Sequence, residues 1–248
     1  MTRAVLDHVA IGARSRDDVA ADFSGWFGGR EVARFAIASW AGLQLAFAGG
    51  IRLEVLEPVE NPADDFMERF LQRNGTSPHH ATFKVEDIRG ALAELKQLGI
   101  EPVKVDLSDP GWQEAFLHPA LGLGTVVQLA QQGGPWSAEK EPAPAPEGSM
   151  RAEFLGAELA SDLAVASRVF GEVLGGSPRQ VGSGVAYSWP GGGTMVVNPV
   201  GKGQKPRVLA LVFRQSPDAQ TELDAGVQRL YDGPATLVKL GPHGAWPR

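Results

Sequence analysis

The sequence predicts an α+β protein built from a repeated β-α-β-β-β module, and three observations lead to this class. Residues 80–85 alternate apolar and polar side chains as a half-buried strand does, and a helical pattern that ends at Gly99 follows them. Residues 5–13 have the same character and also precede a helical pattern with a glycine stop. Each of these two strands carries a histidine, His8 in the first and His80 in the second. The sequence therefore indicates that the strand–helix module is duplicated.

Composition limits the possible classes of protein. The chain has 248 residues, of which 43% are apolar and 21% charged, values typical of a globular protein of one large or two ordinary domains. With no cysteine, disulfides and thiolate metal sites are excluded. No apolar run approaches a bilayer span and residues 1–4 lack a signal-peptide core, so we expect a cytoplasmic protein without membrane contact. The net charge of −6 argues against nucleic-acid partners.

The first module covers residues 5–58. After the strand at 5–13, Ser15-Arg16-Asp17-Asp18 has the spacing of a capping box, and Gly28-Gly29 ends the predicted helix. Three strands are predicted next, at 31–37, 43–48 and 51–56, the last two separated by a Gly49-Gly50 turn. A short connecting helix is predicted over 61–74.

The second module repeats this order. The strand at 80–85 and the helix at 87–98 are followed by predicted strands at 102–106, 114–118 and 125–130. The Pro-, Ala- and Glu-rich stretch 134–150 then has nothing to bury and is typical of a semi-rigid linker. We expect residues 1–133 to form one domain.

The pattern starts again beyond the linker, over residues 151–248. A third module is predicted from a strand at 154–160, a helix at 162–174 and strands at 185–189 and 194–197, with a hairpin turn at 191–193. A fourth and incomplete module follows, with a strand at 208–213, a helix at 221–230 and a strand at 235–240. Modules that cannot bury their own faces are expected to pair with their neighbours.

Four polar residues occupy matching positions of the first two modules. Nearly the same interval separates His8 from Glu54 as separates His80 from Gln128, and in each pair the first residue lies on the first strand of its module and the second on the last. Two modules related by a pseudo-twofold axis would bring these side chains together in the cleft between them. Two imidazoles, a carboxylate and an amide oxygen suit a divalent ion such as zinc, nickel, cobalt, manganese or iron.

The residues around these positions resemble the vicinal oxygen chelate superfamily, and most closely its methylmalonyl-CoA epimerase and glyoxalase-like members. The resemblance is carried by residues 6–11 (LDHVAI), 52–58 (RLEVLEP), 79–88 (HHATFKVEDI), 116–119 (FLHP) and 124–129 (GTVVQL). It covers residues 5–132 well and residues 152–240 only as a weak repeat of the module pattern.

The resemblance implies two tandem domains of paired βαβββ modules, the glyoxalase/bleomycin-resistance/dioxygenase fold, the second domain being degenerate. It also implies a metal ion held by His8, Glu54, His80 and the residue at position 128. The chemistry of the superfamily is metal stabilisation of an enolate-like oxyanion while a proton or bond beside a carbonyl is rearranged.

The sequence departs from that pattern in two places. The epimerase and glyoxalase patterns carry Glu at position 128, where this chain has Gln128, and an amide cannot accept the proton. The epimerase pattern also has an acid just before the glycine of the third strand, whereas residues 39–41 before Gly42 include no carboxylate. In the second half, Gly156, Met195 and an apolar residue near Leu209 take the ligand positions, so we expect that half to be structural.

Other candidate residues have simpler interpretations. On strand alternation His79 points away from His80, which favours a structural or supporting role. His118 lies at a strand end and is expected at the rim or in packing. Gln128 is either a ligand or a core amide.

Three functional hypotheses follow. The first is a metal-dependent isomerase, epimerase or lyase that acts on a small carbonyl compound or acyl-CoA, with Glu54 as the one carboxylate that can be placed in the site. The second is an Fe²⁺ dioxygenase that uses His8, His80 and Glu54. The third is a non-catalytic ligand-binding or resistance protein. All three expect a small-molecule partner and a monomer or homodimer.

Overall fold

The computed structural model describes residues 2–37, 39–47, 51–59, 66–137, 152–215, 227–229 and 235–238. Within these ranges the chain is an α+β protein with two mixed β-sheets. The predicted Gly49-Gly50 turn and most of the predicted linker lie outside the described residues. No helix in these ranges is long and apolar enough to cross a membrane.

The first sheet has eight strands in the order β2-β3-β4-β1-β5-β8-β7-β6 and comes from the first two modules. The elements of the first module, with its connecting helix, are β1 (Ala4–Gly12), α1 (Arg16–Phe27), β2 (Arg30–Ala36), β3 (Trp40–Ala46), β4 (Arg52–Pro58) and α2 (Phe66–Asn74). Those of the second are β5 (Ser77–Val85), α3 (Ile88–Gln97), β6 (Lys104–Asp106), β7 (Trp112–Leu117), a 3₁₀ turn (Pro119–Leu121) and β8 (Val126–Gln132).

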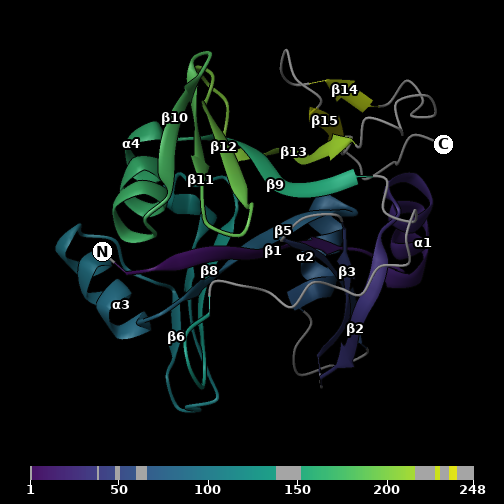
Figure 1. Cartoon of the computed structure of the whole chain (residues 1–248), viewed down its shortest axis with the longest axis horizontal. Coiled ribbons are helices and arrows are strands. Elements are labelled where there is room, and N and C mark those ends of the chain that lie inside the picture. The colour runs from purple at the N-terminus through teal and green to yellow at the C-terminus, as the bar shows by residue number, and fades with distance from the viewer. Residues whose placement is uncertain are drawn as a thin grey trace. The chain divides into compact units, whose positions relative to one another are not determined.

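The second sheet has seven strands in the order β10-β11-β12-β9-β13-β15-β14. Its elements are β9 (Ala152–Ser161), α4 (Leu163–Ala166) continued by a π-helix (Ser167–Val173), β10 (Ser177–Val181), β11 (Gly184–Ser188), β12 (Thr194–Pro199), β13 (Arg207–Gln215), β14 (Val227–Arg229) and β15 (Ala235–Val238). Antiparallel pairing joins β10 to β11 and β11 to β12, and Figure 1 shows these three strands running side by side.

Local sequence signals explain where the helices begin and end. The Ser15 side chain accepts a hydrogen bond from the Asp18 backbone N–H, and Gly28 ends α1 in the left-handed conformation (φ 71°). In the second module Asp87 caps α3 by accepting from the Gly90 backbone N–H at 3.0 Å. Because both caps follow a strand that carries a histidine, the repeat places His8 and His80 at matching points of their modules.

Tertiary contacts group the chain into two compact units, which we describe separately. The first comprises Met1–His8, His80–Lys140 and Gly156–Leu209, and the second comprises Val9–His79, Glu141–Leu155 and Ala210–Arg248. Both units draw on segments before and after the Pro-rich stretch. The units do not coincide with the expected domains 1–133 and 151–248, and those boundaries remain a prediction.

The core of the first unit is an aromatic cluster. The Phe83 ring lies 4.8 Å from the Trp189 ring and 5.9 Å from the Phe170 ring, measured between centroids. The indole N–H of Trp189 donates to the Leu174 carbonyl at 2.7 Å, so this buried donor is satisfied. Residues of β5 and of the third module therefore share one core.

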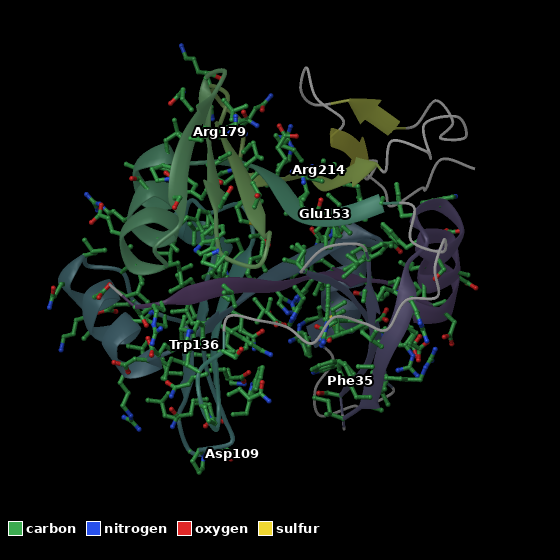
Figure 2. The ribbon with its side chains drawn as sticks, in the orientation of Figure 1. Phe35, Asp109, Trp136, Glu153, Arg179 and Arg214 are labelled. Carbon is green, nitrogen blue, oxygen red and sulfur yellow. The ribbon has the colours of Figure 1, made fainter. Side chains whose placement is uncertain are left out.

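The second unit has an aromatic core of its own. Phe213 on β13 stacks on Phe27 of α1 with centroids 4.2 Å apart and planes 7° from parallel. Phe23, Phe47 and Phe154 also contact the Phe213 ring. Figure 2 labels Arg214, the next residue along β13, whose guanidinium pairs with Glu153 at 2.7 Å.

Two sequence expectations fail in the second half. The pattern over 221–230 predicts a helix, which is wrong for Val227–Arg229, because these residues form β14 and pair antiparallel with β15. Strand pairing satisfies their backbone groups and overrides a weak helical propensity. The strand β10 is not predicted, since most of its residues are exposed and the segment lacks a buried alternating face.

The Phe213 stack yields a stability prediction. Phe213→Ala removes a fully buried ring that contacts four other phenylalanines, so we expect a loss of about 3–5 kcal/mol in the free energy of unfolding. Urea denaturation measures the change. Val103→Ala, at a side chain that is 62% exposed, serves as the control and should change stability by less than about 0.5 kcal/mol. Equal effects of the two variants would contradict the assigned core.

Candidate metal centre

Three residues from three strands form a compact polar group. His8 on β1, Glu54 on β4 and His80 on β5 are all buried, at 5%, 5% and 8% exposure. One ligand atom from each lies within 4.8 Å of those of the other two. The imidazole rings of His8 and His80 are 5.5 Å apart between centroids and inclined at 75°, so they meet edge to face. Two imidazoles and a carboxylate at these distances could hold a divalent metal ion.

Asp7 orients the His8 ring. His8 Nδ1 lies 2.7 Å from the Asp7 Oδ2 atom, and a carboxylate only accepts hydrogen bonds. This contact places a proton on Nδ1, and in the neutral tautomer that carries it Nε2 is the nitrogen that could bind a metal ion. The other oxygen of Asp7 lies 3.4 Å from Lys84 Nζ, which balances the charge of this buried acid.

Glu54 is held by its neighbour across the strand pair. Gln44 on β3 lies opposite Glu54 in the register, and its amide N–H donates to Glu54 Oε1 at 2.9 Å. The Gln44 carbonyl oxygen in turn accepts from Arg52 at 3.0 Å. Because arginine is only a donor, this contact fixes which end of the amide faces Glu54. One carboxylate oxygen of Glu54 is thus positioned by an amide N–H.

Gln128, the fourth ligand that the sequence predicts, makes two close contacts through its amide. On β8, Gln128 lies opposite Thr82 of β5, and the Thr82 hydroxyl donates to the amide oxygen at 2.7 Å. Its amide N–H donates to Glu114 Oε2 on β7 at 2.9 Å. The amide oxygen is therefore directed toward the strand that carries His80. Metal ligation by Gln128 stays a prediction.

The His79 side chain lies beside two phenylalanine rings. The His79 ring lies 4.7 Å from the Phe70 ring and 6.0 Å from the Phe66 ring, both of which belong to α2. Burial lowers the pKa of His79 to about 4, although the nearby Glu54 carboxylate acts in the opposite direction. His79 is thus neutral at pH 7 and packs against α2.

Gly42, before which the epimerase pattern has an acid, is covered by a ring. A Cβ atom at Gly42 would lie 2.7 Å from the Phe35 ring, so a larger residue here would require this ring to shift. Phe35 lies on β2, where Figure 2 labels it.

The sequence did not point to Asp7, Gln44 or Glu114. Asp7 adjoins His8 along a strand, and simple alternation would send the two side chains to opposite faces. Gln44 and Glu114 lie opposite or diagonal to their partners on neighbouring strands. Finding them needs the strand register, although the repeated order of strands contains part of that information.

Comparison with known proteins agrees with this geometry. Residues 7–116 match the model of the glyoxalase/bleomycin resistance protein/dioxygenase superfamily, a segment that contains His8, Glu54 and His80. The match covers somewhat less than half of the chain and lies within its first two modules. No curated protein sequence matches the chain at a significant level.

Solved structures similar to this chain include a hypothetical protein of Bacillus halodurans, with 24% identity and a TM-score of 0.47, covering 54% of this chain and 98% of that one. A methylmalonyl-CoA epimerase variant of Streptomyces coelicolor, in complex with 2-nitronate-propionyl-CoA, has 20% identity and a TM-score of 0.46, covering 54% of this chain and all of that one. Methylmalonyl-CoA epimerase from Mycobacterium tuberculosis has 20% identity and a TM-score of 0.45, covering 53% and 89%. Similarity at this level leaves the substrate of this chain open.

The metal centre predicts a selective loss of metal. His8→Ala and His80→Ala each remove an imidazole of the buried group, so both variants should lose stoichiometric divalent metal in equilibrium dialysis. His118→Ala is the matched control, since His118 is exposed and accepts a hydrogen bond from the Ala120 backbone N–H. Retention of one ion per chain by both buried-site variants would contradict the assignment.

A charge exchange tests Gln128. Gln128→Glu alone would place two carboxylates in contact, because the Gln128 amide now donates to Glu114. The double variant Gln128→Glu with Glu114→Gln keeps the net charge and the hydrogen bond but moves the anion to position 128. If Gln128 is a ligand, this variant should bind metal at least about tenfold more tightly in chelator competition. Unchanged affinity would mean that Gln128 is a core amide.

Proposed function

We propose that this protein is a metal-dependent isomerase, epimerase or lyase that acts on a small carbonyl compound or an acyl-CoA thioester. The observation that carries the proposal is the buried group of His8, Glu54 and His80, which lies within the residues that match this superfamily. A divalent ion bound there supplies the positive charge that stabilises an enolate-like oxyanion on the substrate. We further propose that its partners are small molecules rather than nucleic acid, in keeping with the net charge of −6.

The chain's own residues prepare the site before substrate binds. Asp7 holds the His8 ring in one tautomer, and Gln44 holds one oxygen of Glu54. These contacts limit the reorganisation that ligand binding requires. Preorganisation of this kind suits stabilisation of developing charge better than it suits transient ligand storage.

The proton acceptor in this proposal is a carboxylate. Glu54 is the one carboxylate of the buried group, whose other two members are histidines. Gln128 cannot accept a proton in this role. Glu114 is a further carboxylate beside Gln128, but its Oε2 atom already accepts hydrogen bonds from both Gln128 and Trp112. We therefore assign proton transfer to Glu54.

A second candidate function is an Fe²⁺ dioxygenase. The observation that favours it is the composition of the buried group, since two histidines and one carboxylate form the ligand set of many non-haem iron oxygenases. The hydrogen bonds of the Gln128 amide to Thr82 and Glu114 are compatible with such a three-residue set.

Isotope exchange separates the two candidates. The metal-loaded protein is incubated in deuterium oxide with a 2-methylacyl-CoA thioester and with a small 2-hydroxy ketone, and the α-carbon is monitored by NMR. Solvent deuterium should enter at that carbon with wild type and at least about a hundredfold more slowly with Glu54→Gln, the loss expected without a general base. The metal content of each sample shows whether the variant still binds its ion.

Three outcomes are informative for the proposal. Exchange that persists in Glu54→Gln contradicts the assigned base. Oxygen consumption by the iron-loaded protein without exchange favours the dioxygenase. Stoichiometric metal with neither activity on a panel of carbonyl compounds favours a ligand-binding protein and contradicts both enzymatic proposals.

A further inference from the structure

Two arginines share a cross-strand row with Ala46. In the register of β2, β3 and β4, Arg30 lies opposite Ala46, and Ala46 lies opposite Arg52. The next row on the same face contains Gln44 and Glu54. Residues directly opposite one another across a strand pair project to the same face, so Arg52 and Glu54 are neighbours on one face of β4. A cation thus adjoins a member of the candidate metal centre.

Arg52 differs from the ion-paired arginines of this protein. Arg16, whose side chain is 16% exposed, pairs with Glu57 at 3.1 Å, and Arg34 pairs with both Glu31 and Asp17. Arg52 is also partly buried, yet in the described part of the chain its hydrogen bond goes to the neutral Gln44 amide and no carboxylate lies at ion-pair distance. Because its hydrogen-bond partner is neutral, the Arg52 guanidinium can pair with an anionic ligand without first breaking an ion pair.

The single hydrogen bond also fixes how the guanidinium is presented. Arg52 Nη1 donates to the Gln44 carbonyl oxygen at 3.0 Å, and Gln44 in turn donates to Glu54. The contact uses one of the five N–H groups of Arg52. The remaining donors form part of a planar fork, which matches the two oxygens of a carboxylate or phosphate. The fork is therefore preorganised beside Glu54.

We propose that Arg52 binds an anionic group of the substrate, a carboxylate or a phosphate, while the substrate's carbonyl group is held at the metal centre. The inference rests on the function proposed above and narrows its substrate class to carbonyl compounds with a negative charge. Small Ala46, 7% exposed, leaves Arg52 and Arg30 as the large side chains of the row. The row of Arg30, Ala46 and Arg52 contains no acidic residue, so none of its side chains repels a bound anion.

The test uses the full chain loaded with Co²⁺ and three simple probes. Isothermal titration measures the affinity for oxalate, for inorganic phosphate and for imidazole, a neutral metal ligand. The variants are Arg52→Gln, which removes the charge, Arg52→Lys, which keeps it, and Arg34→Gln, an exposed arginine of the same half of the chain, as the control. Metal affinity is measured for each protein by chelator competition.

In Arg52→Gln we expect at least about a tenfold loss of affinity for oxalate, phosphate or both, the size of one charge-assisted hydrogen bond. Arg52→Lys should recover part of it, while imidazole and metal affinities stay unchanged. The anion that loses affinity identifies the substrate group as carboxylate or phosphate.

Other results overturn the inference. Unchanged affinity for both anions in Arg52→Gln contradicts it. A parallel loss of metal and imidazole affinity means that Arg52 only positions Gln44 and Glu54. Failure of wild type to bind metal contradicts the proposed function itself, whereas normal metal binding with unchanged anion affinity contradicts the role of Arg52 alone.

Discussion

The burial of the Glu54 carboxylate close to two buried imidazoles is the constraint on which the rest of the site depends. A carboxylate that is only 5% exposed loses most of its hydration, and an isolated charge in such a place would be strongly destabilising. Its amide contact with Gln44 offsets part of this cost, and a divalent ion would offset more. A divalent ion bound at the candidate centre would couple metal binding to folding, since it would stabilise the state that holds its ligands together.

Charged residues next to the candidate metal centre orient its side chains or the amides that contact them. Asp7, balanced by Lys84, fixes the tautomer of His8, and Arg52 fixes the Gln44 amide that faces Glu54. In the second module Glu114 fixes the Gln128 amide in a similar way. In each case a residue that can only donate or only accept decides the orientation of a neighbour that can do both. The charged residues therefore determine which atoms of the site donate and which accept hydrogen bonds. The strand register determines which side chains are neighbours.

Much of the first sheet follows from local sequence signals. The caps at Ser15 and Asp87 and the alternating pattern of β5 locate the elements, and the repeat relates His8 to His80. The contacts of Asp7, Gln44 and Glu114 could not be predicted in this way, because they depend on side-chain conformation and on which strands are neighbours. The strand β14 was missed for a related reason, as three residues carry no period and gain their conformation from pairing with β15. Where the intrinsic secondary-structure propensity of a segment is weak, pairing with a neighbouring strand determines its conformation.

X-ray absorption spectroscopy of the metal-loaded protein tests the central claim most directly. The account predicts one ion per chain, whose nearest-neighbour shell consists of nitrogen and oxygen atoms at about 2.0–2.2 Å, with the outer-shell scattering of two imidazole rings. His80→Ala should reduce the imidazole contribution or abolish binding. An ion surrounded by oxygen atoms alone, or a protein that binds no divalent metal at micromolar concentration, would contradict the assignment of His8, Glu54 and His80 as a metal centre.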